Sequence, residues 1–242
     1  MAIYAIGDLH LPGHQEKPMN VFGDHWDRHF DVIRENWLSM VSPEDVVLIP
    51  GDISWAMQLE EARDDLMQIA ALPGRKLLLR GNHDYWWNSI SKVRALLPEN
   101  MYAIQNDALS LDGVVYCGTR GWNIPGEGQP ADPQDVKIFQ RELLRLEMSL
   151  QQAEKLAHGS LPVVVMMHYP PLYKDLLSTP FTEILERYGA RTVVFGHLHG
   201  AGIRFGLEGL VRGIEYHLVS CDALHFSLRR IDESVFFPKD KI

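Results

Sequence analysis

The sequence predicts an α/β protein built on one mixed β-sheet or on two packed sheets. Up to Gly200, short aliphatic and β-branched runs alternate with longer stretches of helical periodicity, and after it the pattern is mostly strand. The composition, 46% hydrophobic and 23% charged, is that of a folded protein. No repeat, low-complexity tract or linker interrupts the 242 residues, so we expect a single domain over residues 1–242.

The predicted strands fall into two groups. Five apolar runs predict buried strands at residues 2–6, 46–49, 76–79, 163–167 and 192–195. Residues 101–118 contain three short apolar segments with turns at Asn106–Asp107 and Asp112–Gly113, a pattern typical of a β-meander. Three further strands are expected at residues 203–207, 215–219 and 225–231.

Helical periodicity predicts the intervening elements. Apolar residues recur at a spacing of three to four over residues 26–37, 59–69 and 136–157, and Gly159 followed by Pro162 ends the last of these stripes. A short helix is expected from Asn88 or Ser89 to Leu97, before Pro98. Another is expected to begin at Ser178 or Thr179 with Pro180 and to stop near Gly189.

Charge and cysteine content exclude several classes of protein. The net charge of −9 argues against a broad, non-specific grip on nucleic acid, but it allows a small phosphorylated substrate if a metal ion supplies positive charge. Two cysteines are too few for a disulfide framework. The N-terminal residues do not resemble a signal peptide and no apolar run is long enough to span a membrane, so we expect a cytoplasmic protein with no membrane partner.

Polar side chains follow each of the five buried strands. Because ligands bind at the carboxyl ends of the strands in open α/β sheets, we expect these side chains to converge on one edge. In Asp8-x-His10 and His197-x-His199 the two side chains lie two residues apart, so an extended chain directs both toward the same site. The candidate metal ligands are Asp8, His10, Asp52, Asn82, His168, His197 and His199.

This donor set predicts the kind of metal. Oxygen and imidazole donors without a thiolate suit Zn, Mn or Fe rather than a cysteine-lined structural zinc site. Seven donors are too many for one tetrahedral ion but fit two ions that share a carboxylate. Such a pair lowers the pKa of a bridging water and stabilises a displacement at phosphorus. Asp52 is the natural bridging ligand.

The same residues resemble the five motif blocks of the calcineurin-like metallophosphoesterases. The blocks occur in the family's order over residues 8–199. They are Asp8-x-His10, Gly51-Asp52, Gly81-Asn82-His83-Asp84, His168 and Gly196-His197-x-His199.

The resemblance implies a four-layer αββα sandwich of two mixed sheets with a dinuclear centre. One metal is expected on Asp8, His10, Asp52 and His199, and the other on Asp52, Asn82, His168 and His197. His83 is then the catalytic residue: it lies over the substrate phosphoryl group and protonates or hydrogen-bonds the leaving oxygen.

One departure from the family concerns the residues after Gly51-Asp52. In its protein serine/threonine phosphatases an Asp-Arg-Gly segment supplies a phosphate-binding arginine, whereas residues 53–57 here read Ile-Ser-Trp-Ala-Met. A phosphoprotein phosphatase is therefore not expected. Arg120, between Gly118 and Gly121, is a candidate replacement phosphate clamp, because the arginine fork matches phosphate oxygens.

The leading hypothesis is a metal-dependent phosphohydrolase in which a bridging hydroxide attacks a phosphate ester, with phosphodiesters favoured over monoesters. Two alternatives stay open: a nuclease of the same family, and a non-catalytic metal-binding interaction module. Residues 12–23 and 121–133 are expected to shape the pocket. Some tryptophans are expected to rim the cleft, although core packing is the simpler expectation for each; these are Trp55, Trp86, Trp87 and Trp122.

Overall fold

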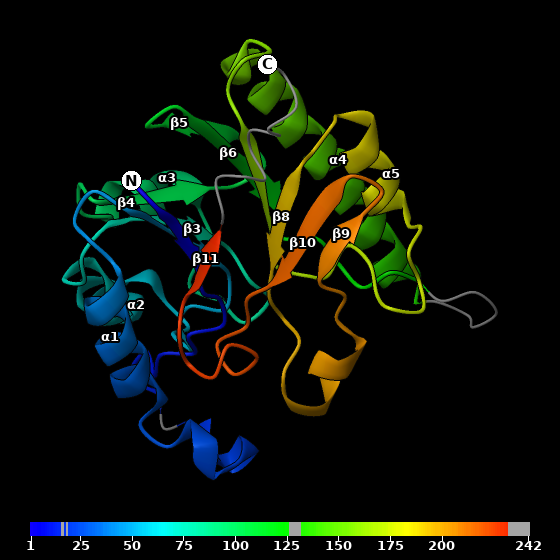
Figure 1. The fold of residues 1–242 in the computed structure, drawn as a ribbon. Helices are drawn as coiled ribbons and strands as arrows, with labels where there is room; N and C mark the ends of the chain where they lie inside the picture. Colours follow the sequence, from blue (N-terminus) through cyan, green and yellow to red (C-terminus); the bar gives the residue numbers. More distant parts are fainter. Residues whose placement is uncertain (16, 18, 126–131, 232–242) are drawn as a thin grey trace.

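Two β-sheets lie face to face between two groups of helices in the computed structural model, which describes residues 1–15, 17, 19–125 and 132–231 (Figure 1). The αββα sandwich is thereby confirmed. Residues 16, 18 and 126–131, parts of the two segments expected to shape the pocket, and residues 232–242, the end of the expected domain, lie outside the described residues.

The first sheet has the strand order β11-β1-β2-β3-β4. Its strands are β1 (Ile3–Ala5), β2 (Val46–Pro50), β3 (Arg75–Leu79), β4 (Met101–Ile104) and β11 (Arg229–Ile231). Strands β1 to β4 are parallel, and only the edge strand β11 is antiparallel to its neighbour. The carboxyl ends of the parallel strands therefore lie at one edge of the sheet.

The second sheet has the order β5-β6-β7-β8-β10-β9. Its strands are β5 (Ala108–Leu111), β6 (Val114–Thr119), β7 (Val163–Met167), β8 (Thr192–Phe195), β9 (Gly209–Val211) and β10 (Ile214–Leu218). The four central strands are parallel and the two edge strands are antiparallel to them. Both sheets are mixed, as expected.

Helices cover the outer faces of the two sheets. They are α1 (His29–Met40), α2 (Leu59–Ala70), α3 (Ile90–Leu96), α4 (Pro133–Ala157) and α5 (Pro180–Arg187), with 3-10 turns η1 (Met19–Phe22), η2 (Asp24–Trp26) and η3 (Gly200–Phe205). Helix α4 begins where Asp132 accepts a hydrogen bond from the Gln134 amide, with Pro133 in the first turn. Thr179 and Thr182 cap α5 reciprocally, so the start predicted at Thr179–Pro180 is confirmed.

Three apolar layers hold the sandwich together. Alternate residues of a strand point to opposite faces, so Val47 and Ile49 of β2 pack on the helix side while Val46 and Leu48 pack between the sheets. Helices α1 and α2 complete the first outer layer, and α4 and α5 complete the second. The central layer is contributed by the inner faces of both sheets.

The predicted meander at residues 101–118 is wrong. The three strands exist, but β4 follows helix α3 and joins the first sheet parallel to β3, whereas β5 and β6 form a hairpin in the second sheet. The chain changes sheet at residues 105–107, where Asn106 has a φ of 60° and Asp107 accepts a hydrogen bond from the Gln105 amide. A local pattern cannot show this change of sheet.

Two predictions in the last quarter of the chain also need correction. Residues 203–207 lie largely in η3, whose local bonds include Gly202 N–H to His199 O, so they are not a strand. The strand expected at residues 225–231 is reduced to β11, because His225 and Phe226 have φ values of 51° and 60°, outside the strand region.

The two sheets meet at the carboxyl ends of their central strands. The Gly7 amide after β1 donates to Val219 O after β10 at 2.6 Å, and the Cys221 amide donates back to Gly7 O. These bonds bring the loops of both sheets to one place. Among the described residues, no helix is long and apolar enough to cross a membrane.

Candidate metal centre and active site

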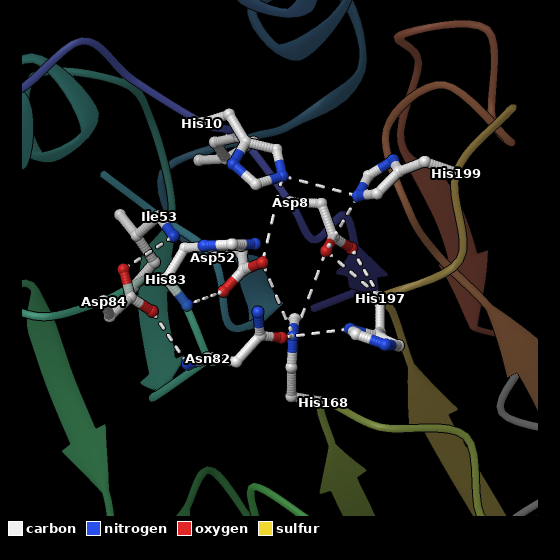
Figure 2. Close-up of polar contacts among 12 residues, drawn as sticks. Asp8, His10, Asp52, Ile53, Asn82, His83, Asp84, His168, His197 and His199 are labelled. Carbon is white, nitrogen blue, oxygen red and sulfur yellow. Dashed lines mark hydrogen bonds and ion pairs between the residues drawn. The ribbon is translucent and has the colours of Figure 1, made fainter. Parts of the chain in front are cut away.

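All seven predicted ligands lie together where the two sheets meet (Figure 2). They follow five strands, three from the first sheet and two from the second. Asp8 and His10 follow β1, Asp52 follows β2, Asn82 follows β3, His168 follows β7, and His197 and His199 follow β8. The site is therefore assembled from loops of both sheets.

The backbone at four of these positions is strained. Asp8, His10, Asp52 and His197 have φ values of 59°, 45°, 50° and 73°, in the left-handed region that non-glycine residues seldom adopt. Each such residue costs about 1–3 kcal/mol and persists only where the surrounding structure holds it. Strain concentrated on ligand candidates is typical of a functional site.

Two glycines allow the motif loops to approach one another. A Cβ on Gly81 would lie 2.1 Å from Asp52 Oδ1, and a Cβ on Gly196 would lie 2.2 Å from Asp8 Oδ2. Any side chain at either position would displace a carboxylate of the site. Gly81 and Gly196 thus leave room for the carboxylates of Asp52 and Asp8, which come from other loops.

The first group of ligand atoms surrounds Asp8. His199 Nε2 lies 3.3 Å from Asp8 Oδ1 and 3.4 Å from His10 Nε2, and His10 Nε2 lies 3.9 Å from Asp52 Oδ2. Ligands of a tetrahedral ion with bonds of 2.0–2.1 Å are about 3.4 Å apart. The spacing of these atoms fits one divalent cation.

The second group surrounds Asn82. Its Oδ1 lies 2.6 Å from His168 Nε2 and 3.0 Å from His197 Nδ1, and His168 Nε2 is 3.5 Å from Asp52 Oδ2. Asp52 belongs to both groups: Oδ2 reaches His10 and His168, while Oδ1 accepts a hydrogen bond from the His83 amide. Asp52 therefore makes contacts with members of both groups.

Outer hydrogen bonds orient the histidines. His168 Nδ1 lies 3.0 Å from Pro50 O, a pure acceptor, so Nδ1 carries the hydrogen and the Nε2 lone pair faces Asn82 Oδ1. Two acceptors facing each other are repulsive unless a cation lies between them. His199 Nδ1 donates to Asp222 Oδ1 at 2.8 Å, which directs Nε2 into the site.

The electrostatics of the site favour positive charge. Burial, together with the negative charge of Asp8, raises the pKa of Asp52 to about 8. Burial opposes protonation of His199, but Asp8 and Asp222 outweigh it and raise the pKa of His199 to about 10. The carboxylates that hold a proton there would hold a divalent cation in its place.

His83 lies in the cleft beside the ligand groups (Figure 2). Its ring packs 4.5 Å from the Trp55 ring, and its Nδ1 is buried with no hydrogen-bond partner among the described residues. Burial lowers the pKa of His83, with a further contribution from the charge of His168. Nε2 is then the ring nitrogen available to a bound molecule.

The cleft has a volume of about 380 Å³, with a polar floor and an apolar wall. His10, Asp52, His83, His197 and His199 form the floor. Met19, Phe22, Trp26 and Trp55 supply the wall, and Trp55 stacks on His10 with the ring centroids 4.9 Å apart. Residues 12–23 thus reach the cleft through Met19 and Phe22.

The other aromatic and charged candidates lie elsewhere. Trp86 and Trp87 are buried in the core, and Trp86 donates to Asp84. Asp84 accepts further hydrogen bonds from the amides of Ile53, Ser54 and Gly81, so it braces the loops and is not a ligand. Arg120 does not line the cleft: with Trp122, it lines a second cavity and lies 3.7 Å from Glu142.

Sequence reasoning missed Asp222 and Tyr169. Asp222 follows the strand predicted at residues 215–219, so the rule that found the other polar residues would have found it. Tyr169 comes directly after His168, and its ring lies 4.1 Å from that of His197. Met19 and Phe22 lie in the segment 12–23 that was expected to shape the pocket, whereas Trp26 was expected only as part of an apolar helical stripe and reaches the cleft through the tertiary fold.

Strained carboxylate and histidine loops at the carboxyl ends of two packed sheets define a metal-dependent hydrolase site. The sequence-family model of the calcineurin-like phosphoesterases matches residues 1–201 of this chain. The chain belongs to this family and is accordingly a metallophosphoesterase, a hydrolase of phosphoester bonds.

Solved structures show the same fold at low sequence identity. Phosphopantetheinyl hydrolase from Mycobacterium tuberculosis is 17% identical with a TM-score of 0.57, and the match covers 100% of this chain and 97% of that one. The protein TT1561 of Thermus thermophilus is 12% identical with a TM-score of 0.55, covering 95% and 97%. AQ665 from Aquifex aeolicus, described as a protein of unknown function, is 20% identical with a TM-score of 0.50, covering 95% of each chain. No curated protein matches the chain by sequence.

Proposed function

We propose that this chain is a dinuclear phosphohydrolase that acts on small organic phosphate esters and prefers diesters to monoesters. The observation that carries the proposal is the pair of ligand groups that share Asp52. Asp8, His10, Asp52 and His199 would hold one ion, and Asp52, Asn82, His168 and His197 the other. Their oxygen and imidazole donors suit Mn, Fe or Zn.

The protein's own residues set up the reaction around that pair. When bound, two divalent ions supply Lewis acidity toward the phosphoryl oxygens and lower the pKa of a water. The Asp52 carboxylate fixes the spacing of the two groups, and Asp222 holds the ring of His199. His83, with Nδ1 buried, presents Nε2 to the phosphoryl group, where it stabilises developing charge and donates a proton or a hydrogen bond to the leaving oxygen.

The cleft wall favours an ester with an apolar group. Trp26, Trp55, Met19 and Phe22 offer an aromatic and aliphatic surface to the part of the substrate that does not react. Such a surface is unlike the cationic groove that tracks a nucleic-acid backbone. This contrast and the net charge of −9 place the nuclease alternative second.

The charge of the cleft favours a diester. Among the described residues that line it, none is Lys or Arg. A monoester carries close to two negative charges at neutral pH and a diester carries one, so a cleft without a cationic clamp suits the diester better. Lys17, with Nζ 4.5 Å from the centre of the Trp55 ring, is the cation that lies near the wall.

The test combines metal analysis with two substrates. Purified protein is assayed for metal content and for turnover of bis-p-nitrophenyl phosphate and p-nitrophenyl phosphate. About two equivalents of metal and a higher kcat/KM for the diester support the proposal. A higher value for the monoester would overturn the diester preference, and no turnover after addition of Mn²⁺ would favour the non-catalytic module.

A matched pair of variants tests the role of His83. We expect His83→Asn to lower kcat by about 10²–10⁴-fold, the usual contribution of a general acid, with metal content unchanged. His158→Asn makes the same chemical change at the end of α4, away from the cleft, and should leave kcat unaltered. A His83→Asn enzyme with normal kcat would exclude this role.

A further inference from the structure

A second cavity, with a volume of about 360 Å³, lies beside the carboxyl ends of β3, β4 and β6 and the first half of α4. It is separate from the metal cleft and shares none of its lining residues. Four of the residues that line it are arginines: Arg80, Arg120, Arg141 and Arg145. Trp122 forms part of its wall, with the Arg120 guanidinium 4.6 Å from the centre of the ring.

The charge of this cavity is unbalanced. Glu142 is the one carboxylate among the described lining residues, so four arginines and one glutamate give a formal charge of +3 in a chain whose net charge is −9. Glu142 is buried, accepts a hydrogen bond from Thr119 at 2.6 Å, and pairs with Arg145 at 2.6 Å and Arg120 at 3.7 Å. Both carboxylate oxygens of Glu142 therefore already have partners.

The other two arginines have no such partner. Among the described residues, Arg80 and Arg141 make no ion pair or side-chain hydrogen bond, and Arg80 Nε is buried and unsatisfied. Asp84 attracts Arg80 at longer range, and the nearby Asp135 is held by Trp122. Arg80 is half-buried, and a half-buried guanidinium without an acceptor is costly, whereas Arg141 is exposed and adds positive charge at the rim; together they call for an anion.

We propose that this cavity binds an oxyanion, a phosphate or carboxylate group of a small molecule, between Arg80, Arg120, Arg141 and Arg145. Tyr169 stands between this cavity and the metal centre: its ring lies 5.2 Å from Trp122 on one side and 4.1 Å from His197 on the other. The bound anion is therefore distinct from the phosphoryl group that reacts.

The cavity also connects to the metal centre through the backbone. Arg80 comes two residues before Asn82, and the Arg120 carbonyl accepts hydrogen bonds from the amides of His168 and Tyr169 at 3.1 and 2.9 Å. An anion that fixes these two arginines would stabilise the loops that carry Asn82 and His168. An anion bound in this cavity can thus influence the loops of the metal centre without contacting the centre itself.

The choice of variants follows from the ion pairs. Removing Arg120 or Arg145 would take one of the two cationic partners from the buried Glu142 and could disturb the fold. Arg80→Gln and Arg141→Gln remove positive charge while the Glu142 pairs stay intact. Arg63→Gln, at an exposed position on α2, is the control for the loss of one charge.

The experiment titrates inorganic phosphate into the full chain by calorimetry. We expect wild type, Arg63→Gln and Asp52→Asn to bind phosphate with similar affinity, and Arg80→Gln and Arg141→Gln to bind at least tenfold more weakly. A parallel titration with citrate tells whether phosphate or carboxylate is preferred. Because binding needs no turnover, the result is independent of the proposed hydrolase activity.

Three outcomes would overturn the proposal. One is the absence of binding to wild type at millimolar phosphate and citrate. Another is equal affinity in Arg80→Gln, Arg141→Gln and Arg63→Gln. The third is loss of binding in Asp52→Asn alone, which would place the anion at the metal centre.

Discussion

At the scale of single residues, the site depends on carboxylates that lie outside the two groups of candidate ligands. Asp222 accepts hydrogen bonds from His199 Nδ1 at 2.8 Å and from the Gly200 amide at 2.9 Å, so one carboxylate sets both the ring and the loop. Asp84 does the same for the loops after β2 and β3. Of the strained candidate positions, Asp52 lies next to Ile53, whose amide Asp84 holds, so this buried carboxylate supports the backbone there.

Asp222→Asn tests this support. The amide keeps the shape of the side chain, but it removes the negative charge that polarises His199 and can direct an N–H toward Nδ1. We expect metal affinity to fall by about 10–100-fold, the usual effect of losing an outer partner of a ligand histidine. Titration of chelator-treated protein with Mn²⁺ measures it.

The control for this variant is Asp64→Asn, which alters an exposed carboxylate paired with His14 at 3.0 Å. Its metal affinity should match wild type. Equal affinities for Asp222→Asn and wild type would show that the loop, and not the carboxylate, orients His199.

At the scale of elements, a buried lysine links β3 to the end of α2. Lys76 is fully buried, and its Nζ donates to the carbonyls of Ala70 and Leu72. A cation near the C-terminus of a helix is favourable, but burial dominates and lowers the pKa of Lys76 to about 8. In the unfolded chain the same amine titrates near 10.4.

This shift makes the stability of the fold depend on pH in a predictable direction. Between about pH 8 and 10.4 the unfolded chain binds more protons at Lys76 than the folded chain, so the free energy of unfolding rises with pH. Lys76→Met removes this term. We expect the unfolding free energy of wild type, minus that of Lys76→Met, to increase by up to about 3 kcal/mol from pH 7 to pH 10.

Urea unfolding at the two pH values gives this difference. The tyrosines titrate in both proteins, so subtracting the unfolding free energy of the variant removes their contribution. If this difference stays constant or decreases between pH 7 and pH 10, the lowered pKa of Lys76 is contradicted.

The elements also show what the sequence can and cannot predict. Runs such as residues 163–167 and 192–195 predict their strands because a strand buried on both faces has a continuous apolar pattern. The same reasoning fails at residues 101–118, since membership of a sheet depends on partners distant in sequence. The candidate ligands were predictable from their position after strands. The segment 12–23 was predicted to shape the pocket, but the side chains that form the wall, Trp26 among them, depend on tertiary packing.

At the scale of the whole molecule, the ligand groups join the two halves of the sandwich. Asp8, Asp52 and Asn82 come from the first sheet, and His168, His197 and His199 from the second. Backbone bonds between Gly7 and Val219 reinforce the same junction. An ion held at this point closes a contact between layers that would separate on unfolding.

The thermal stability of the whole fold should therefore depend on metal. A ligand present at 100 times its Kd stabilises the folded state by about 2.7 kcal/mol. For a chain of 150–250 residues this corresponds to a rise in Tm of about 5–10 °C. We expect Mn²⁺ to raise the Tm of chelator-treated wild type by that amount in a calorimetric scan. Asp52→Asn, which disrupts both ligand groups, should show little of the increase. If Mn²⁺ binds without changing the Tm of wild type, the unfolded chain binds the ion as tightly as the folded one, and the ligand groups are not a metal site that the fold creates.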